Sequence, residues 1–237
     1  VVFNGASNSI AGATTFAQGG TLTLGNGTGD STDFAGGLVA TAPSGISAQG
    51  TVKADGGSGV LTLGDSDTGV TVAANLTVGG TSTGTISLGD ATLADGATLT
   101  AGAGAANQID LDAITGTAGS TASNLTINSS GAVTVAEAVG TDIGTVTVTQ
   151  SGGTTFTGNV AAGTSVVLTD TTGTIAFSSD LTTPTLTTAG EDYGVSLLGG
   201  STITNLATFL NTGTTQIGDA TGDTNTFNGG VTATAGA

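Results

Sequence analysis

"TFTGNV" (residues 155–160) and "AFSSDL" (176–181) align on their phenylalanines, Phe156 and Phe177, which lie 21 positions apart. A step of about 20 residues is typical of one coil of a β-solenoid, in which each coil contributes two or three short strands. In a parallel β-helix each coil hydrogen-bonds to the next, so that like residues stack above like. We therefore predict a right-handed parallel β-helix of roughly 20-residue coils, with about a dozen coils in the chain.

Two further phenylalanine pairs have a similar spacing. Phe16 and Phe34 are separated by 18 positions, and so are Phe209 and Phe227. We interpret both pairs as further markers of the coil period, with aligned rings at one level of the interior.

Alternation of aliphatic residues with threonine recurs along the chain. It is seen in "TLTLG" (21–25), "VLTLGD" (60–65), "NLTIN" (124–128) and "TVTVT" (145–149). A period of two predicts strands with one buried face, and β-branched residues favour strands. Clusters of Gly, Asn, Asp and Ser between these runs supply turn residues. The chain is predicted to be all-β and to form a single continuous segment over residues 1–237.

The composition limits how thick the core can be. The 237 residues include 43 Gly and 7 Phe, but only one Tyr and no Trp. Such a chain can build only a thin interior from Val, Leu, Ile and Ala, which suits a solenoid. Tandem immunoglobulin-like domains are the alternative, but they need a thicker core.

A longer repeat overlies the coil period. Residues 10–42 match residues 203–235 at an offset of 193, with 15 identities in 33 positions, Phe34 with Phe227 among them. We interpret this match as one large repeat of about 193 residues followed by the start of the next. The parent protein is then expected to be a tandem array from which this chain is a piece, and the absence of Met agrees with that expectation.

The charge balance excludes several classes of partner. Seventeen acidic residues face a single base, Lys53, and the formal net charge is −16. Binding to nucleic acid requires Lys and Arg to neutralise phosphates, so it is excluded, and anionic membrane surfaces are disfavoured. Apolar stretches fall far short of the ~20 residues that a membrane helix needs. With no Cys, no disulfide can stabilise the fold. These features favour an acidic extracellular protein.

The style of the sequence resembles that of a known class of surface proteins. "TFTGNV", "FNGGVTATAG" (227–236), "NTGTTQIGD" (211–219) and "GTLTLGNGTGD" (20–30) are similar to stretches of bacterial autotransporter passengers and large surface antigens. Filamentous-haemagglutinin-like and surface-layer proteins share this style. The resemblance implies a β-solenoid on the outside of a bacterium that serves in adhesion, a coat or a filament. It implies no particular site residue.

An enzymatic role finds little support in the sequence. Glycoside cleavage needs paired carboxylates in a groove, commonly with basic residues and aromatic platforms for the sugar. Asp110 and Asp112 alternate with apolar residues and are predicted to face solvent together, and Glu191 with Asp192 forms a further pair. There is no His or Arg, and Tyr193 is the only polar aromatic residue. No catalytic or cofactor-binding residue is predicted.

Two binding roles remain as weaker alternatives. "GDSDTG" (64–69) offers Asp65 and Asp67 as weak candidates for calcium ligands, although a third ligand position is missing. "TLT" at 21–23, 98–100 and 185–187, together with Thr145, Thr147 and Thr149, resembles the outward threonine arrays of ice-binding solenoids. These triplets show no constant phase in the sequence, and ordinary outward threonines are the simpler interpretation.

The sequence therefore predicts a structural or adhesive segment of a giant repetitive bacterial surface protein, located outside the cell. The segment would form a stiff rod, coat or filament through self-association. An adhesin that binds a cell-surface or glycan ligand is the first alternative, and an ice-binding solenoid is the second.

Overall fold

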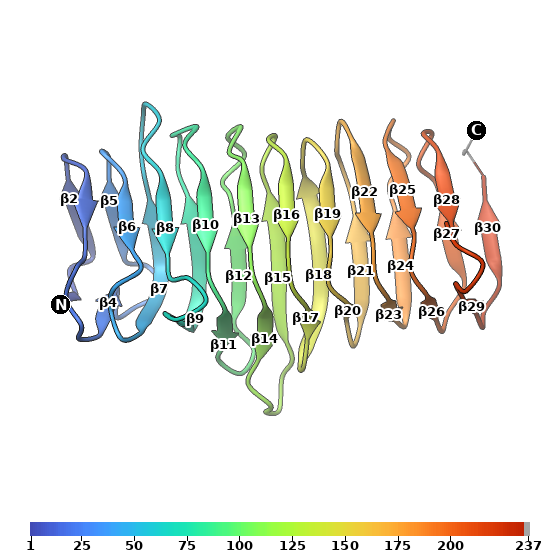
Figure 1. Ribbon diagram of the computed structural model, residues 1–237, viewed down its shortest axis with the longest axis horizontal. Helices are drawn as coiled ribbons and strands as arrows, with labels where there is room; N and C mark the ends of the chain where they lie inside the picture. Colours follow the sequence, from blue (N-terminus) through green and yellow to red (C-terminus); the bar gives the residue numbers. More distant parts are fainter. Residues whose placement is uncertain (235–237) are drawn as a thin grey trace.

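Short strands with one buried side build a coil that repeats along one axis. The structure is a computed structural model that describes residues 1–234. Its 30 strands form a 20-stranded and a 10-stranded sheet, and the strands pair in parallel with strands of the coils before and after. Figure 1 shows the coils side by side from the N-terminal to the C-terminal end. The predicted all-β parallel β-solenoid is confirmed.

Each coil has three faces, which we number in chain order. The first face contains β1 (Val2–Phe3), β4 (Leu22–Leu24), β11 (Ala91–Leu93), β14 (Ile114–Gly116), β17 (Val139–Gly140), β20 (Val160–Ala161), β23 (Leu181–Thr183), β26 (Ser201–Ile203) and β29 (Asn225–Phe227). The second face contains β2 (Ser7–Ile10), β5 (Ser31–Phe34), β12 (Thr98–Ala101), β15 (Ser123–Asn128), β18 (Ile143–Gln150), β21 (Ser165–Leu168), β24 (Thr185–Thr188), β27 (Ala207–Phe209) and β30 (Val231–Ala233).

Two long strands, β7 (Ile46–Lys53) and β9 (Val70–Gly79), run through both of these faces and join them into the larger sheet. The third face is the 10-stranded sheet. It contains β3 (Thr14–Thr15), β6 (Leu38–Ala40), β8 (Leu61–Leu63), β10 (Ile86–Leu88), β13 (Ile109–Leu111), β16 (Val133–Val135), β19 (Thr154–Phe156), β22 (Thr174–Phe177), β25 (Gly194–Leu197) and β28 (Thr215–Ile217).

The coils are fewer and longer than the sequence predicts. The third face has one strand per coil, so its 10 strands mark about ten coils rather than a dozen. Leu61 pairs with Ile86, 25 positions later, whereas Ile175 pairs with Val195, 20 positions later. The predicted 20-residue step therefore holds between the third-face strands from β16 to β28, which are 20 or 21 positions apart. Longer corner loops lengthen most coils of the N-terminal half and also the last coil, in which Ala207 pairs with Val231 after 24 positions.

Aromatic stacking confirms one of the predicted alignments and corrects the other two. Phe156 and Phe177 are register partners whose rings stack with centroids 4.9 Å apart and planes 4° from parallel. Phe34 instead pairs with Ile10 and meets Phe16 edge-on across the interior. The 18-residue spacing thus connects different faces of the solenoid.

The predicted alignment of Phe209 with Phe227 is wrong for the same reason. Phe209 belongs to β27 on the second face, whereas Phe227 belongs to β29 on the first. Register partners on one face lie 20 or more positions apart in these coils, so a spacing of 18 brings the chain to the face before.

A buried row of polar side chains runs along the corner that precedes the third face. The hydroxyl of Ser129 donates to the carbonyl oxygens of Ala105 and Asn107 on the coil before, and accepts from the amide of Gly131. A Cβ atom at Gly131 would lie 2.1 Å from the Asn107 oxygen, so only glycine fits there. The row comprises Ser82, Asn107, Ser129, Ser151, Thr171 and Asn211, all at most 3% exposed. These bonds satisfy backbone groups that the tight corner leaves unpaired.

The two stretches related by the offset of 193 share their local conformation. The carboxylate of Asp30 accepts from the amides of Asn26 and Gly27, and that of Asp223 accepts from the amides of Asp219 and Ala220. Each turn leads into a short strand, β5 after the first and β29 after the second. These strands lie on different faces, the second and the first, so the shared sequence specifies a turn and a strand rather than a place in the coil. Residue 235 of the match lies outside the described residues.

Thr154 interrupts an inward row of aliphatic side chains on the third face that runs from Leu38 to Val195. It is fully buried between Val133 and Ile175, and its hydroxyl has no hydrogen-bond partner. An unpaired buried hydroxyl costs about 1–3 kcal/mol. We expect Thr154→Val to raise the free energy of unfolding by up to about that amount, measured by urea denaturation.

The neighbouring Thr155 provides the matched control, because it points outward and is exposed. Thr155→Val should change the free energy of unfolding by no more than about 0.5 kcal/mol. A destabilised Thr154→Val variant would show that the hydroxyl contributes favourably to the interior.

Candidate functional site

The outward side of the second face carries a row of hydroxyl groups along the solenoid axis. Successive register partners form this row, which we call row A, and only Val167 among them lacks a hydroxyl. Row A consists of Ser7, Ser31, Thr51, Thr77, Thr100, Thr126, Thr147, Val167, Thr187, Thr208 and Thr232. The side chains are half-buried or exposed, and the intervening residues of β12, β15 and β18 fill the core.

A second row lies two residues before row A on five consecutive coils. This row B consists of Thr98, Asn124, Thr145, Ser165 and Thr185. The triplets 98–100 and 185–187 therefore lie at the same phase of the second face, whereas the triplet 21–23 belongs to the first face through β4. The three triplets thus do not share one phase, although two of them do. Unequal coils conceal this phase, because Thr98 pairs with Asn124 after 26 positions and Ser165 with Thr185 after 20. Asn124 and Ser165 also interrupt the threonine pattern.

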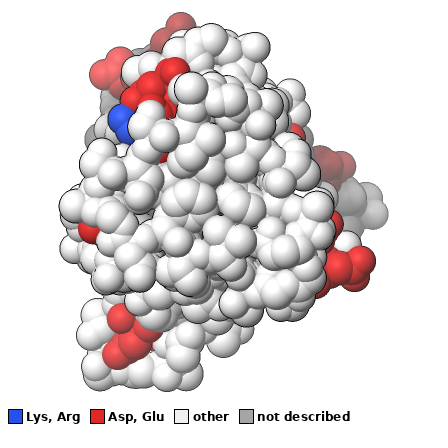
Figure 2. Space-filling model, turned by 90° about the vertical axis from the view of Figure 1, so that its left-hand side faces the viewer, with Lys and Arg blue, Asp and Glu red and all other residues white. Residues whose placement is uncertain are grey.

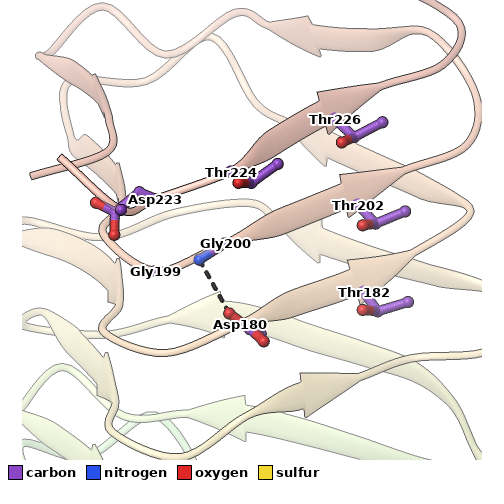
Figure 3. Close-up of a pocket in the computed structure, with 9 residues that line it drawn as sticks. Asp180, Thr182, Gly199, Gly200, Thr202, Asp223, Thr224 and Thr226 are labelled. Atoms are coloured by element: carbon purple, nitrogen blue, oxygen red, sulfur yellow. Dashed lines mark hydrogen bonds between the residues drawn. The ribbon is translucent and has the colours of Figure 1, made fainter. Parts of the chain in front are cut away.

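The first face carries a shorter hydroxyl row that ends in a shallow hollow. Thr182, Thr202 and Thr226 are register partners in β23, β26 and β29, and all three are exposed. Figure 3 shows their side chains one above another, pointing in the same direction. A hollow of about 410 Å³ lies beside them and is bounded by Asp180 and Asp223.

The carboxylates at this hollow are already engaged by the backbone. Asp180 accepts a hydrogen bond from the amide of Gly200 at 3.0 Å (Figure 3). Hydrogen bonds from the amides of Asp219 and Ala220 lower the pKa of Asp223. The hollow therefore presents hydroxyls and an anionic rim, which suits water or a polyhydroxy ligand better than an anion.

Most charged groups lie at the corners, whereas Asp33 in β5 and Asp110 in β13 lie within strands. Figure 2 shows the molecule along its axis, with acidic groups in separate clusters near the margin and uncharged surface between them. Lys53 forms an ion pair with Asp55. The side-chain hydrogen bond in this pair raises the pKa of Lys53 and lowers that of Asp55.

Four carboxylates gather at the corner that follows the third face. Burial, together with the charges of Asp90, Asp110 and Asp65 in decreasing order, raises the pKa of Asp112. Asp110 and Asp112 are thus neighbours at the surface, as the sequence predicts. Within residues 1–234 no group of three or more His, Cys, Asp or Glu side chains is arranged to hold a metal ion.

The two weak calcium candidates serve different roles in one turn. The Asp65 carboxylate accepts from the amides of Asp67 and Thr68 at 3.0 and 2.9 Å. Thr68 is buried and donates its hydroxyl to the carbonyl oxygens of Thr41 and Pro43. Asp65 therefore closes the turn, while the side chain of Asp67 points into solvent.

The remaining acidic pair and the tyrosine that follows it differ in their exposure to solvent. Glu191 and Asp192 are exposed, whereas Tyr193 is 1% exposed. The Tyr193 hydroxyl donates to the carbonyl oxygen of Leu168 and accepts from the amide of Ala189, both at 2.9 Å. Burial raises its pKa. Tyr193 fills a corner and offers no exposed ring to a sugar.

The raised pKa of Asp112 makes the stability of the fold depend on pH. A raised pKa means that the folded state binds this proton more tightly than the unfolded chain, so stability at this position is lost as pH rises through the folded-state pKa. Asp112→Asn removes the unfavourable charge and should raise the melting temperature near neutral pH. The gain should shrink towards pH values of about 3, where the native carboxyl is protonated.

Asp192→Asn is the control for this measurement, because Asp192 is an exposed carboxylate at the corner between β24 and β25, which precedes the third face. Thermal unfolding followed by circular dichroism at both pH values measures the difference. An equal gain from both variants would assign the effect to the overall negative charge instead of this corner.

No helix in the described part of the chain has the length and apolarity to cross a membrane. A comparison of the sequence with protein-family models and with curated proteins found no match, and neither did a comparison with solved structures.

Proposed function

We propose that this chain is a stiff, non-catalytic segment of an extracellular bacterial surface protein. The observation that carries the proposal is the unbroken parallel pairing through all three faces of successive coils. Bending such a coil stack stretches ladders on one face and compresses those on another. The stack therefore transmits force along its axis without a hinge.

The proposal also includes a right-handed winding of the coils and a location on the bacterial cell surface. A right-handed coil is the hand that parallel strand connections adopt in nearly all cases. The net charge of −16 keeps neighbouring molecules soluble, and the lack of Cys makes the fold independent of redox conditions. The resemblance to autotransporter passengers and large surface antigens supports a place on the bacterial cell surface. An array of 193-residue repeats would lengthen the rod.

The arrangement of polar residues supports a role without catalysis. The acidic pairs are half-buried or exposed, and the Tyr193 hydroxyl is held in two backbone hydrogen bonds. Self-association into a filament or surface layer is the proposed mode of action. Adhesion to a cell-surface glycan is the second candidate, favoured by the hydroxyl-lined hollow at Thr182, Thr202 and Thr226.

Excision of one coil tests whether the segment is a modular rod. Deleting residues 133–153 would bring Thr154 onto Ile109, because Val133 pairs with both. This variant should unfold cooperatively, and its length in small-angle X-ray scattering should fall by about 4.8 Å. Deleting residues 133–143 instead breaks register and should abolish the fold. Equal loss of structure in both variants would contradict a modular rod.

Electron microscopy separates the two candidate roles. A structural segment at increasing protein concentration should form ordered filaments or layers. An adhesin should remain a single short rod and bind bacterial or host cells in a saturable way, as measured with a fluorescently labelled chain. Single rods without cell binding would contradict both roles.

A further inference from the structure

Rows A and B together form a two-row array on the second face, and eight of its ten positions on five consecutive coils carry a hydroxyl group. From this array we propose that the second face binds ice, over the five coils in which both rows are present. The inference goes beyond the proposed rod and does not depend on it. Figure 1 shows the strands that carry the array, β12, β15, β18, β21 and β24, lying next to one another.

The backbone sets the spacing of the array in both directions. Neighbouring parallel strands are about 4.8 Å apart, and residues two positions apart on a strand are separated by about 6.6 Å. The triplets at 98–100, 124–126, 145–147, 165–167 and 185–187 occupy the points of this grid, with Asn124 and Val167 as the two members without a hydroxyl. Threonine has a stiff χ1, so a row of threonines repeats its methyl and hydroxyl groups with the strands. A repeating grid suits a partner that is itself a lattice.

The hydroxyls of the array are available to an external partner. Within residues 1–234 no side chain of row A donates or accepts a hydrogen bond. In row B, Thr145 and Ser165 contact each other at 3.4 Å, and Asn124 and Thr185 accept one bond each. Most of the hydroxyls can therefore hold ordered water, with the adjacent methyl groups between them.

The array is also neutral in a strongly acidic molecule. None of its members carries a charge between residues 98 and 187, although the chain has a net charge of −16. A charged side chain orders water molecules around itself. That order differs from the arrangement of water in ice, so a charge would disfavour contact with an ice surface. A neutral grid of hydroxyls and methyls matches the surface of ice, which has no net charge.

Other partners fit the array less well. Ten coils about 4.8 Å apart and about 10 Å of strand width offer roughly 480 Å² to a second copy. Stable interfaces bury about 800 Å² on each partner. Sugars are commonly recognised by stacking on aromatic rings, and no member of the array is aromatic. An ice surface differs from a protein partner because it is flat and periodic. It can contact all members of the array together without a shaped interface.

The test is a charge placed within the array and a matched charge placed outside it. Thr126→Lys with Thr147→Lys changes two stacked positions of row A. Thr134→Lys with Thr155→Lys changes two stacked outward positions on the third face, in β16 and β19. The readouts are the gap between melting and freezing temperatures and the shape of a single ice crystal. Circular dichroism verifies that each variant remains folded.

The native chain should produce a freezing gap and faceted crystals above the level of serum albumin at equal concentration. The row A variant should lose both, and the third-face variant should retain both. The proposal is overturned by round crystals and no gap with the native chain, or by equal loss in both folded variants. It is also overturned if the row A substitutions abolish self-association in sedimentation and leave ice growth unchanged, which would assign this face to a second copy. The length of the rod in scattering is unaffected by these outcomes, so the two proposals can fail separately.

Discussion

The structure depends on parallel register between coils. Once two coils pair in register, each side chain has its counterpart from the next coil about 4.8 Å away. Phe156 and Phe177 stack face to face under this constraint, as do the aliphatic residues of the interior. The same rule acts outside, where threonine stacks on threonine. Charges of one sign would repel at this distance, and the two carboxylates within strands agree with this rule: Asp33 pairs with Lys53, and Asp110 pairs with the uncharged Ser87 and Thr134.

The corners explain both the glycine content and the buried polar residues. A thin coil must turn three times within 20–26 residues, and its corner backbone comes close to the coil before. At Gly131 that approach leaves no space for a Cβ atom. Ser129 and its counterparts then satisfy the carbonyl groups that point inward at the corner. Backbone hydrogen bonds and small residues replace the thick apolar core that this composition cannot build.

The proposed roles use two sides of one architecture. Stiffness comes from the continuous ladders of all three faces, whereas recognition of a lattice needs the regular spacing of one outward face. Both properties arise from repetition, so neither requires a convergent cluster of reactive groups. The hollow beside Thr182 differs, because Asp180 and Asp223 bring localised charge to one end of a hydroxyl row.

The strand class and the solenoid architecture could be predicted from the sequence alone. Alternation in stretches such as 145–149 and the 21-residue step at Phe156 are local properties that a reader can recognise without coordinates. The tertiary structure decided which residues meet. Coil length varies with the corner loops, so Phe16 and Phe34 fall on different faces while the triplets 98–100 and 185–187 fall on the same one. Only the pairing of backbones between coils sets that phase, because a loop can gain a residue without changing either strand.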